Sequence, residues 1–171
     1  MPEAFRAAVI TASDRGAAGL RPIDASGDKL AELLGAADYQ VVERHLLPDD
    51  RGGIAALLAR LADGGGVDLI LTTGGTGLSP RDVTPEATLA VAERLVPGLA
   101  EAMRAASLAK TPMAMLSRAV AAVRGRTLIV NLPGSPKAVA ECWEVIAPVL
   151  PHGLALLTDG GRGQHGESHT S

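Results

Sequence analysis

The chain has 171 residues, a length typical of one domain and short for two. Hydrophobic residues make up 47% of it and charged residues 20%, close to the globular average, which argues against a disordered or fibrous chain. The net charge is −3, no block of like charges stands out, and aromatic residues amount to only 2%. The sequence therefore carries no signature of nucleic-acid binding.

No apolar run approaches the roughly 18 to 20 residues that a membrane-spanning helix needs. The apolar run at residues 7–12 is too short for the core of a signal peptide. The single cysteine, Cys142, cannot form a disulfide within the chain and suits a reducing compartment. We therefore expect a cytoplasmic protein that does not insert into membranes.

Short apolar runs typical of buried strands alternate with segments of helical periodicity along the first half of the chain. The predicted elements are, in order, a strand at 6–12, a helix at 28–34, a strand at 39–46, a helix that ends near 61 and a strand at 67–72. Ser26 is the expected N-cap of the first helix, and Asp49 or Asp50 that of the second. Gly35 and the glycines at 64–66 are expected to end these two helices.

In the second half, Thr84 before Pro85 predicts a capped helix start. The predicted elements are a helix at 84–95, a helix at 97–108, a strand at 127–131, a long helix from Pro136 capped by Ser135, and a short helix at 153–157. Residues 112–125 fit a helix or a strand. Residues 159–171 hold no apolar side chain, so we expect a disordered tail after a single domain at 1–158.

Strands that alternate with helices predict a single-domain α/β fold, a three-layer sandwich with a mainly parallel sheet flanked by helices. In such sheets, ligands bind at the carboxyl ends of the strands. Thr73 and the glycines Gly74, Gly75 and Gly77 follow the third predicted strand. Glycines there permit positive φ and a close approach of backbone N–H groups to an anion, although the loop lacks the lysine of a Walker motif.

Two aspartates are candidates for a magnesium site at the same edge. One aspartate suffices as a helix cap, so Asp49 and Asp50 leave one carboxylate free for another task. Arg81 and Asp82 stand between the glycine loop and a helix start. Mg²⁺ prefers oxygen ligands and commonly binds one or two carboxylates together with phosphate oxygens. Asp49 and Asp82 would supply those carboxylates.

The sequence resembles the Mog/MoaB family of molybdenum-cofactor biosynthesis. The resemblance rests on GGTGLSPRDVTPEAT at 74–88, with SDR at 13–15, PDD at 48–50, LSR at 116–118 and NLPGSPKAVAEC at 131–142. It covers roughly residues 5 to 157 in the same motif order, and extends to the corresponding domains of animal gephyrin and its plant counterpart. The long central motif carries most of the specificity.

The resemblance implies a molybdopterin adenylyltransferase that uses Mg-ATP to place AMP on molybdopterin and releases pyrophosphate. It also implies a homotrimer, with a downstream metal-insertion protein as a possible partner. The implied catalytic and metal-binding residues are Asp49 and Asp82. The implied nucleotide-binding residues are Thr73, Gly74, Gly75, Thr76, Gly77 and Arg81, and the pterin-binding residues are Ser13, Asp14, Ser117, Pro133, Gly134 and Ser135.

Two alternatives stay open at this point. A member of the same family could keep the fold and bind the pterin without catalysis, or act as an assembly module. A different nucleotide-processing enzyme, such as a relative that hydrolyses pyridine nucleotides, could share the domain.

Overall fold

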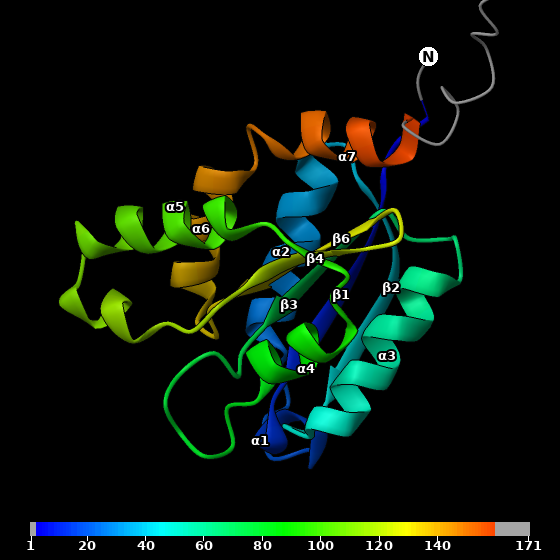
Figure 1. Cartoon of the computed structure of the whole chain (residues 1–171). Coiled ribbons are helices and arrows are strands. Elements are labelled where there is room, and N and C mark those ends of the chain that lie inside the picture. Colours follow the sequence, from blue (N-terminus) through cyan, green and yellow to red (C-terminus); the bar gives the residue numbers. More distant parts are fainter. Residues whose placement is uncertain (1–2, 160–171) are drawn as a thin grey trace, which may run out of the picture.

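The computed structural model describes residues 3–159, in which six strands form one sheet of order β2-β1-β3-β6-β5-β4 (Figure 1). The pairs β1–β2, β1–β3 and β3–β6 are parallel, whereas β5 runs antiparallel to β6 and β4. The strands are β1 (Arg6–Ala12), β2 (Gln40–Leu47), β3 (Leu69–Thr73), β4 (Arg94–Leu95), β5 (Ala121–Arg124) and β6 (Thr127–Leu132). The predicted mainly parallel sheet is confirmed.

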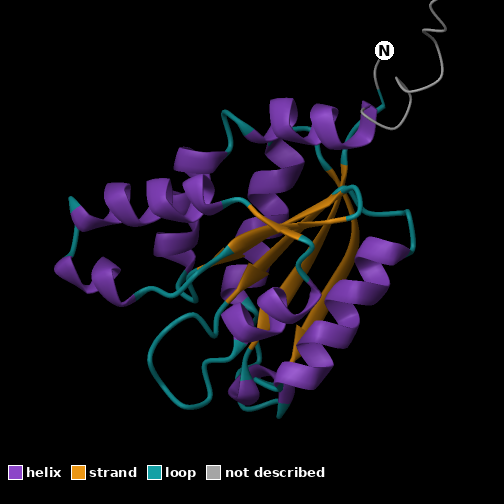
Figure 2. Cartoon of the chain, viewed as in Figure 1, coloured by secondary structure: helices purple, strands orange, loops and turns teal. Residues whose placement is uncertain are grey.

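Helices cover both faces of the sheet, as Figure 2 shows. They are α1 (Asp14–Ala17), α2 (Ala25–Ala36), α3 (Arg51–Asp63), α4 (Thr84–Val91), α5 (Pro97–Leu108), the 3-10 helix η1 (Pro112–Leu116), α6 (Pro136–Ile146) and α7 (Leu150–Asp159). Within the described residues, none of them is by itself long and apolar enough to cross a bilayer. The pair α6 and α7 together passes such a test by length and composition, and is bent by 65°.

Two apolar clusters, one on each face of the sheet, hold the helices against it and so give a fold of three layers. On one face, α2, α5, α6 and α7 pack against odd-numbered residues of β1 and β3 such as Val9 and Leu71. On the other face, α3 and α4 pack against Ala8, Ile10 and Ile70. Every second side chain of a strand points to the same face, so a strand covered on both sides must be apolar throughout. This explains the unbroken apolar runs in the sequence.

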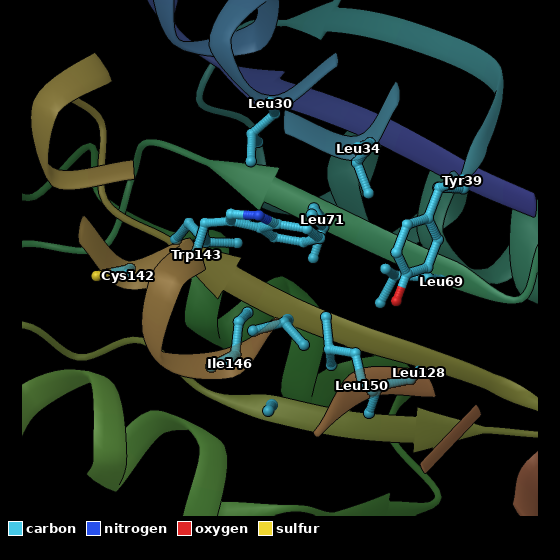
Figure 3. Packing of buried hydrophobic residues seen from close by; sticks show 14 of the residues in the cluster. Leu30, Leu34, Tyr39, Leu69, Leu71, Leu128, Cys142, Trp143, Ile146 and Leu150 are labelled. Atoms are coloured by element: carbon cyan, nitrogen blue, oxygen red, sulfur yellow. The ribbon is translucent and has the colours of Figure 1, made fainter. Parts of the chain in front are cut away.

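The first cluster contains the few aromatic side chains of the chain. Trp143 of α6 lies over the sheet near Leu71 (Figure 3), and its ring meets Tyr39 edge to face, with centroids 6.0 Å apart. The residues expected on the inner face of α6, Val139, Cys142, Trp143 and Ile146, are all buried. The prediction for this helix is confirmed, including the cap by Ser135, whose side chain accepts from the backbone N–H of Ala138 at 3.2 Å.

The expected N-cap of α2 is wrong. The cap is Asp24, whose carboxylate accepts a hydrogen bond from the backbone N–H of Gly27 at 3.1 Å. Thr11 of β1 donates to the other oxygen of Asp24 at 2.9 Å, so a contact between distant segments fixes the helix start. Ser26 is a buried residue of the first turn, and the helix continues through Gly35 to Ala36.

The helix expected at 84–95 is also corrected. Its N-cap is Val83, without a side-chain hydrogen bond, and Thr84 is the first helical residue. The helix ends at Val91, and Arg94–Leu95 instead pairs with β5, where Leu95 lies opposite Ala122. This pairing overrides the helical propensity of the segment. Residues 112–125, which fitted either a helix or a strand, contain both the 3-10 helix η1 and the strand β5.

The last helix is longer than predicted. It spans Leu150–Asp159 rather than 153–157, with Leu150 and Leu154 buried. Asp159 therefore belongs to this helix and not to the predicted tail. Residues 160–171, the rest of that tail, lie outside the described residues, so the expectation of disorder there stays a prediction.

Candidate active site

Four parallel strands, β1, β2, β3 and β6, end at the same edge of the sheet. The loops that follow them enclose a cavity of about 660 Å³. Most of the predicted site residues line it, namely Ser13, Asp14, Asp49, Thr73, Gly74, Gly75, Arg81, Asp82, Gly134 and Ser135. Residues from five separate segments of the sequence therefore come together here.

The other four predicted residues line a second cavity, of about 330 Å³, on the far side of the glycine loop. They are Thr76, Gly77, Ser117 and Pro133. The remaining wall is largely apolar and includes Met103, Met113 and Cys142. The glycine loop thus separates the two cavities, and each cavity receives residues from both the nucleotide-binding and the pterin-binding sets.

The two neighbouring aspartates after β2 have different tasks. Asp50 is the N-cap of α3, since its carboxylate accepts from the backbone N–H of Gly53 at 2.7 Å. Asp49 forms a reciprocal pair with Asp14 instead. Oδ2 of Asp49 accepts from the backbone N–H of Asp14 at 3.0 Å, and Oδ1 of Asp14 accepts from that of Asp49 at 2.9 Å. The structure therefore leaves Asp49 as the aspartate that is free of capping.

The other oxygen of Asp49, Oδ1, is buried and has no hydrogen-bond partner among residues 3–159. Burial raises the pKa of Asp49, and the nearby charges of Asp14 and Asp82 act in the same direction. The pKa of Asp14 is lowered because its carboxylate accepts hydrogen bonds from Arg81 and from the backbone of Asp49. A half-buried carboxylate among other carboxylates favours the binding of a cation.

Arg81 forms a two-pronged ion pair with Asp14. Its Nε and Nη2 donate to the two carboxylate oxygens, each at 2.8 Å. The loop between β3 and α4 is thereby joined to the end of β1. Asp14 and Arg81 are both predicted to bind ligands. In this structure they form an ion pair with each other.

The glycine loop packs against these groups. Gly74 and Gly75 have φ values of +90° and +69°. A Cβ atom on Gly74 would lie 2.5 Å from the carbonyl oxygen of Ala12, and one on Gly75 would lie 2.3 Å from Oγ1 of Thr84 and 3.2 Å from Oδ1 of Asp49. Both the backbone conformation and the space therefore require glycine.

Asp82 turns its carboxylate back over its own loop. Its Oδ2 accepts from the backbone N–H of Ser79 at 3.0 Å, and a Cβ on Gly77 would lie 2.9 Å from the same oxygen. Asp82 and Asp49 both line the larger cavity, and the charge of Asp82 contributes to the raised pKa of Asp49. The two predicted metal-binding carboxylates are thus brought to one place.

Three hydroxyl groups of the predicted set serve structural contacts. Ser13 caps α1 by accepting from the backbone N–H of Gly16 at 3.0 Å, and Ser135 caps α6. Thr73 donates to the carbonyl oxygen of Pro133 at 2.6 Å, which ties the loops after β3 and β6 together. These side chains shape the edge of the sheet.

The carboxylates of this cavity fit a magnesium ion whose ligands come partly from the protein and partly from a substrate. Oδ1 of Asp49 is a buried oxygen with no other partner, and Asp82 lines the same cavity. Within residues 3–159, no group of three or more histidine, cysteine, aspartate or glutamate side chains is arranged to hold a metal. Mg²⁺ commonly takes one or two carboxylates and completes its shell with phosphate oxygens and water.

Two neighbours of the site, Thr84 and Arg118, are not among the residues predicted from the sequence. Thr84 was expected only as a helix cap, whereas its hydroxyl is a buried side-chain group beside Gly75 for which the described part of the chain provides no partner. Arg118 was quoted only within a motif, yet its guanidinium donates to the carbonyl oxygens of Gly77 and Asp82. The signal available for Arg118 was a charged residue directly before the apolar run at 119–123.

The chain is similar to known proteins over most of its length. A family model described as "Probable molybdopterin binding domain" matches residues 8–152. The molybdopterin adenylyltransferase of Helicobacter pylori strain J99 is 41% identical over 151 residues, which are 87% of this chain and 85% of that protein. The protein of the same name from Escherichia coli strain K12 is 42% identical over 157 residues, 88% of this chain and 80% of that protein.

Solved structures agree with these relatives. The molybdopterin biosynthesis enzyme MoaB from Thermus thermophilus superposes with a TM-score of 0.85 at 53% sequence identity. The match covers 90% of this chain and 96% of that structure.

Proposed function

This chain belongs to the family of molybdopterin-binding domains, and on that premise we propose that it transfers AMP from Mg-ATP to the terminal phosphate of molybdopterin. The chain is a nucleotidyltransferase of molybdenum-cofactor biosynthesis, since the relatives it matches along most of its length bear the name molybdopterin adenylyltransferase. The proposal adds the reaction itself. An oxygen of the pterin phosphate attacks the α-phosphorus of ATP, the bond to the bridging oxygen breaks, and pyrophosphate leaves.

One observation carries the proposal: a buried carboxylate oxygen of Asp49 without a hydrogen-bond partner faces the glycine loop at the carboxyl edge of the sheet. Leaving a buried polar atom unpaired in the absence of a ligand is costly. A group that binds substrate or metal accounts for this cost. Asp49 and Asp82 would hold Mg²⁺, which when bound neutralises charge on the phosphates.

The remaining site residues position the reactants. The glycine loop, Thr73 to Gly77, is proposed to bind the nucleotide. Its backbone N–H groups after Gly74 would hold phosphate oxygens for in-line attack, because the N–H of Gly74 itself donates to the carbonyl oxygen of Leu132. Arg81, already close to Asp14, offsets negative charge at the phosphates. No residue needs to act as a nucleophile, because the pterin phosphate attacks.

The two cavities suit two substrates. The larger one contains the carboxylates and is the proposed place of the reacting phosphates. The smaller, apolar one has a volume that suits one of the two ring systems that this reaction brings together. The proposed pterin contacts are Ser117 and Pro133 in the smaller cavity, and Ser13, Asp14, Gly134 and Ser135 in the larger.

The decisive experiment incubates the full chain with molybdopterin, ATP and Mg²⁺ and measures adenylylated pterin and pyrophosphate. We expect both products in equal amounts, and neither after chelation of Mg²⁺. A panel of other nucleotides tests for hydrolysis. Binding of molybdopterin without either product would favour the alternative of a catalytically inactive pterin-binding or assembly module, and hydrolysis without pterin would favour a different nucleotide-processing enzyme.

Assembly and location complete the proposal. We expect a homotrimer, which light scattering at micromolar concentration tests, and hand-over of the product to a metal-insertion protein. The single cysteine, Cys142, is free and buried in the helical layer, which supports a reducing, cytoplasmic location.

A further inference from the structure

The guanidinium of Arg118 joins the two ends of the loop that carries Arg81 and Asp82. Arg118 Nε donates to the carbonyl oxygen of Gly77 at 2.8 Å, and Nη2 donates to that of Asp82 at 2.7 Å. The backbone N–H of Arg118 also donates to the carbonyl oxygen of Thr76 at 2.9 Å. One residue therefore holds the loop where it leaves the sheet and where it approaches α4.

Glu86, in the first turn of α4, provides the opposite charge. Nη1 of Arg118 donates to both of its carboxylate oxygens, at 3.0 Å to Oε2. The planar guanidinium can serve a carboxylate and two carbonyl oxygens at once because its N–H groups point in fixed, divergent directions. A lysine ammonium could keep the ion pair but could not reproduce this fork.

The loop itself stands away from the sheet as a wide connection between β3 and α4 (Figure 1). Leu78 is 65% exposed, so apolar burial does not hold the middle of the loop. A local turn joins Ser79 and Asp82 through two hydrogen bonds of 2.9 and 3.0 Å. That turn fixes Asp82 relative to Ser79, whereas Arg118 fixes Asp82 relative to the rest of the protein.

We propose that Arg118 is a positioning residue of the transfer reaction, which holds Asp82 and Arg81 at the edge of the larger cavity. This inference rests on the proposed function. Arg118 touches the loop carbonyls and not the cavity of Asp49, so it acts through Asp82 and Arg81. Because Ser117 and Gly77 line the smaller cavity, the same residue also joins the walls of both cavities.

Arg124 offers a matched control at the other end of α4. Its Nε and Nη2 donate to the carboxylate of Asp63 at 3.0 Å each, and Nη1 donates to the carbonyl oxygen of Val91 at 3.1 Å. Arg124 therefore combines the same kinds of contact, a carboxylate and a backbone carbonyl, with none of the residues that line either site cavity.

The test compares Arg118→Lys, Arg124→Lys and Glu86→Gln with the wild type in the full chain. For Arg118→Lys we expect kcat to fall about 100-fold, because a misplacement of about 1 Å costs this much in positioned reactions. Amide hydrogens of residues 77–82 should exchange faster with solvent. Arg124→Lys and Glu86→Gln should keep kcat and the exchange rate of this loop near the wild-type values, since both leave the bonds to Gly77 and Asp82 in place.

A purely structural ion pair predicts the opposite pattern. Arg118→Lys, which keeps the charge, would then retain wild-type kcat, whereas Glu86→Gln, which removes the partner charge, would lower it. Either result overturns the inference, as does unchanged hydrogen exchange of the loop in Arg118→Lys. If the wild type forms no adenylylated pterin, the proposed function fails, while the exchange measurement still decides the role of Arg118. If Arg118→Lys does not fold, wild-type kcat and loop exchange in Glu86→Gln support the inference, and their loss contradicts it.

Discussion

The two ends of the parallel strands carry the same pair of residue types. At the amino end, Arg6 donates through Nε and Nη2 to Asp68 at 3.3 and 3.1 Å. At the carboxyl end, Arg81 donates in the same way to Asp14. A third cavity, at the amino end, has a volume of about 910 Å³ and so exceeds the 660 Å³ cavity that Asp49 and Asp82 line. Neither an Arg–Asp pair nor the size of a cavity distinguishes the site.

The two Arg–Asp clusters differ in whether a neighbouring carboxylate oxygen is left without a hydrogen-bond partner. Both oxygens of Asp68 accept hydrogen bonds, including one from the backbone N–H of Arg6 at 2.8 Å. At the carboxyl end, Asp14 is similarly engaged, but its neighbour Asp49 keeps a buried oxygen without a partner in the described structure. A closed polar cluster stabilises a fold, whereas an incomplete one indicates a place for a ligand.

The glycines at the two ends differ in the same sense. Gly65, beside the amino-end cavity, has a φ of +74°, yet a Cβ there would meet nothing within 4 Å. It is a turn residue in open space. Gly75 has a similar φ but packs against Thr84 and Asp49. Close packing of a left-handed glycine against polar groups, rather than the glycine itself, characterises the site.

Substitution of the two carboxylates of the site is the most direct test of the difference between the two ends of the strands. We expect Asp49→Asn or Asp82→Asn to lower the adenylylation rate roughly 100- to 1,000-fold, because charge at the transferring phosphates is no longer neutralised. The double variant should be little worse than the worse single one, as for residues that act as a unit. Wild-type turnover by a folded Asp82→Asn would disprove the metal-site assignment. Initial rates together with melting curves provide the measurement.

Substitution of one glycine at each end tests the packing difference. Gly65→Ala should cost about 1 to 2 kcal/mol, the penalty of a left-handed alanine. Gly75→Ala should cost more and should also abolish activity, since the added methyl group would displace Thr84 or Asp49. Urea unfolding of both variants provides the comparison. Equal losses of stability would show that the loop can yield without disturbing the site.

Substitution of Asp68, at the amino end of the parallel strands, should lower the stability of the fold without changing activity. Asp68→Asn removes the charge that pairs with Arg6 and should cost about 1 to 3 kcal/mol, as for hydrogen bonds to charged groups. The adenylylation rate of the folded variant at low temperature should match that of the wild type. A large loss of kcat with intact folding would mean that the two ends of the sheet are coupled.

The smallest expected effect is on the pH dependence of stability. The pKa of Asp49 lies above its ordinary value of 3.8 in the folded chain, owing to burial and to the charges of Asp14 and Asp82. The folded state thus favours the protonated form, so this contribution to stability is present below the ordinary pKa and is lost as the pH rises through the folded pKa. The asparagine of Asp49→Asn does not ionise, so this variant does not lose stability as the pH rises. The melting temperature of the variant minus that of the wild type should therefore be greater at about pH 7 than at about pH 4. A difference that shrinks with rising pH would contradict the raised pKa.

Much of the fold could be predicted because periodicity is a local property of the sequence. The three consecutive apolar residues at 69–71 can be buried on both faces only in the middle of a covered sheet, and β3 lies there. The inner face of α6 follows from residues three and four positions apart. Asp49 and Asp82 could be nominated as a pair because both follow strands expected to end at one edge, and the resemblance of the central motif reinforced the choice.

Other features depended on partners that are distant in the sequence. Asp24 became the cap of α2 because Thr11 of β1 holds its carboxylate, and Arg94–Leu95 became a strand because β5 offers an open edge. The sequence by itself determined the layers, the parallel strands and the types of residue at the site. Only the tertiary structure decided that Asp14 pairs with Arg81, that Asp49 keeps a free oxygen and that Arg118 ties down the loop, because each of these contacts joins segments whose separation along the chain hides their proximity in space.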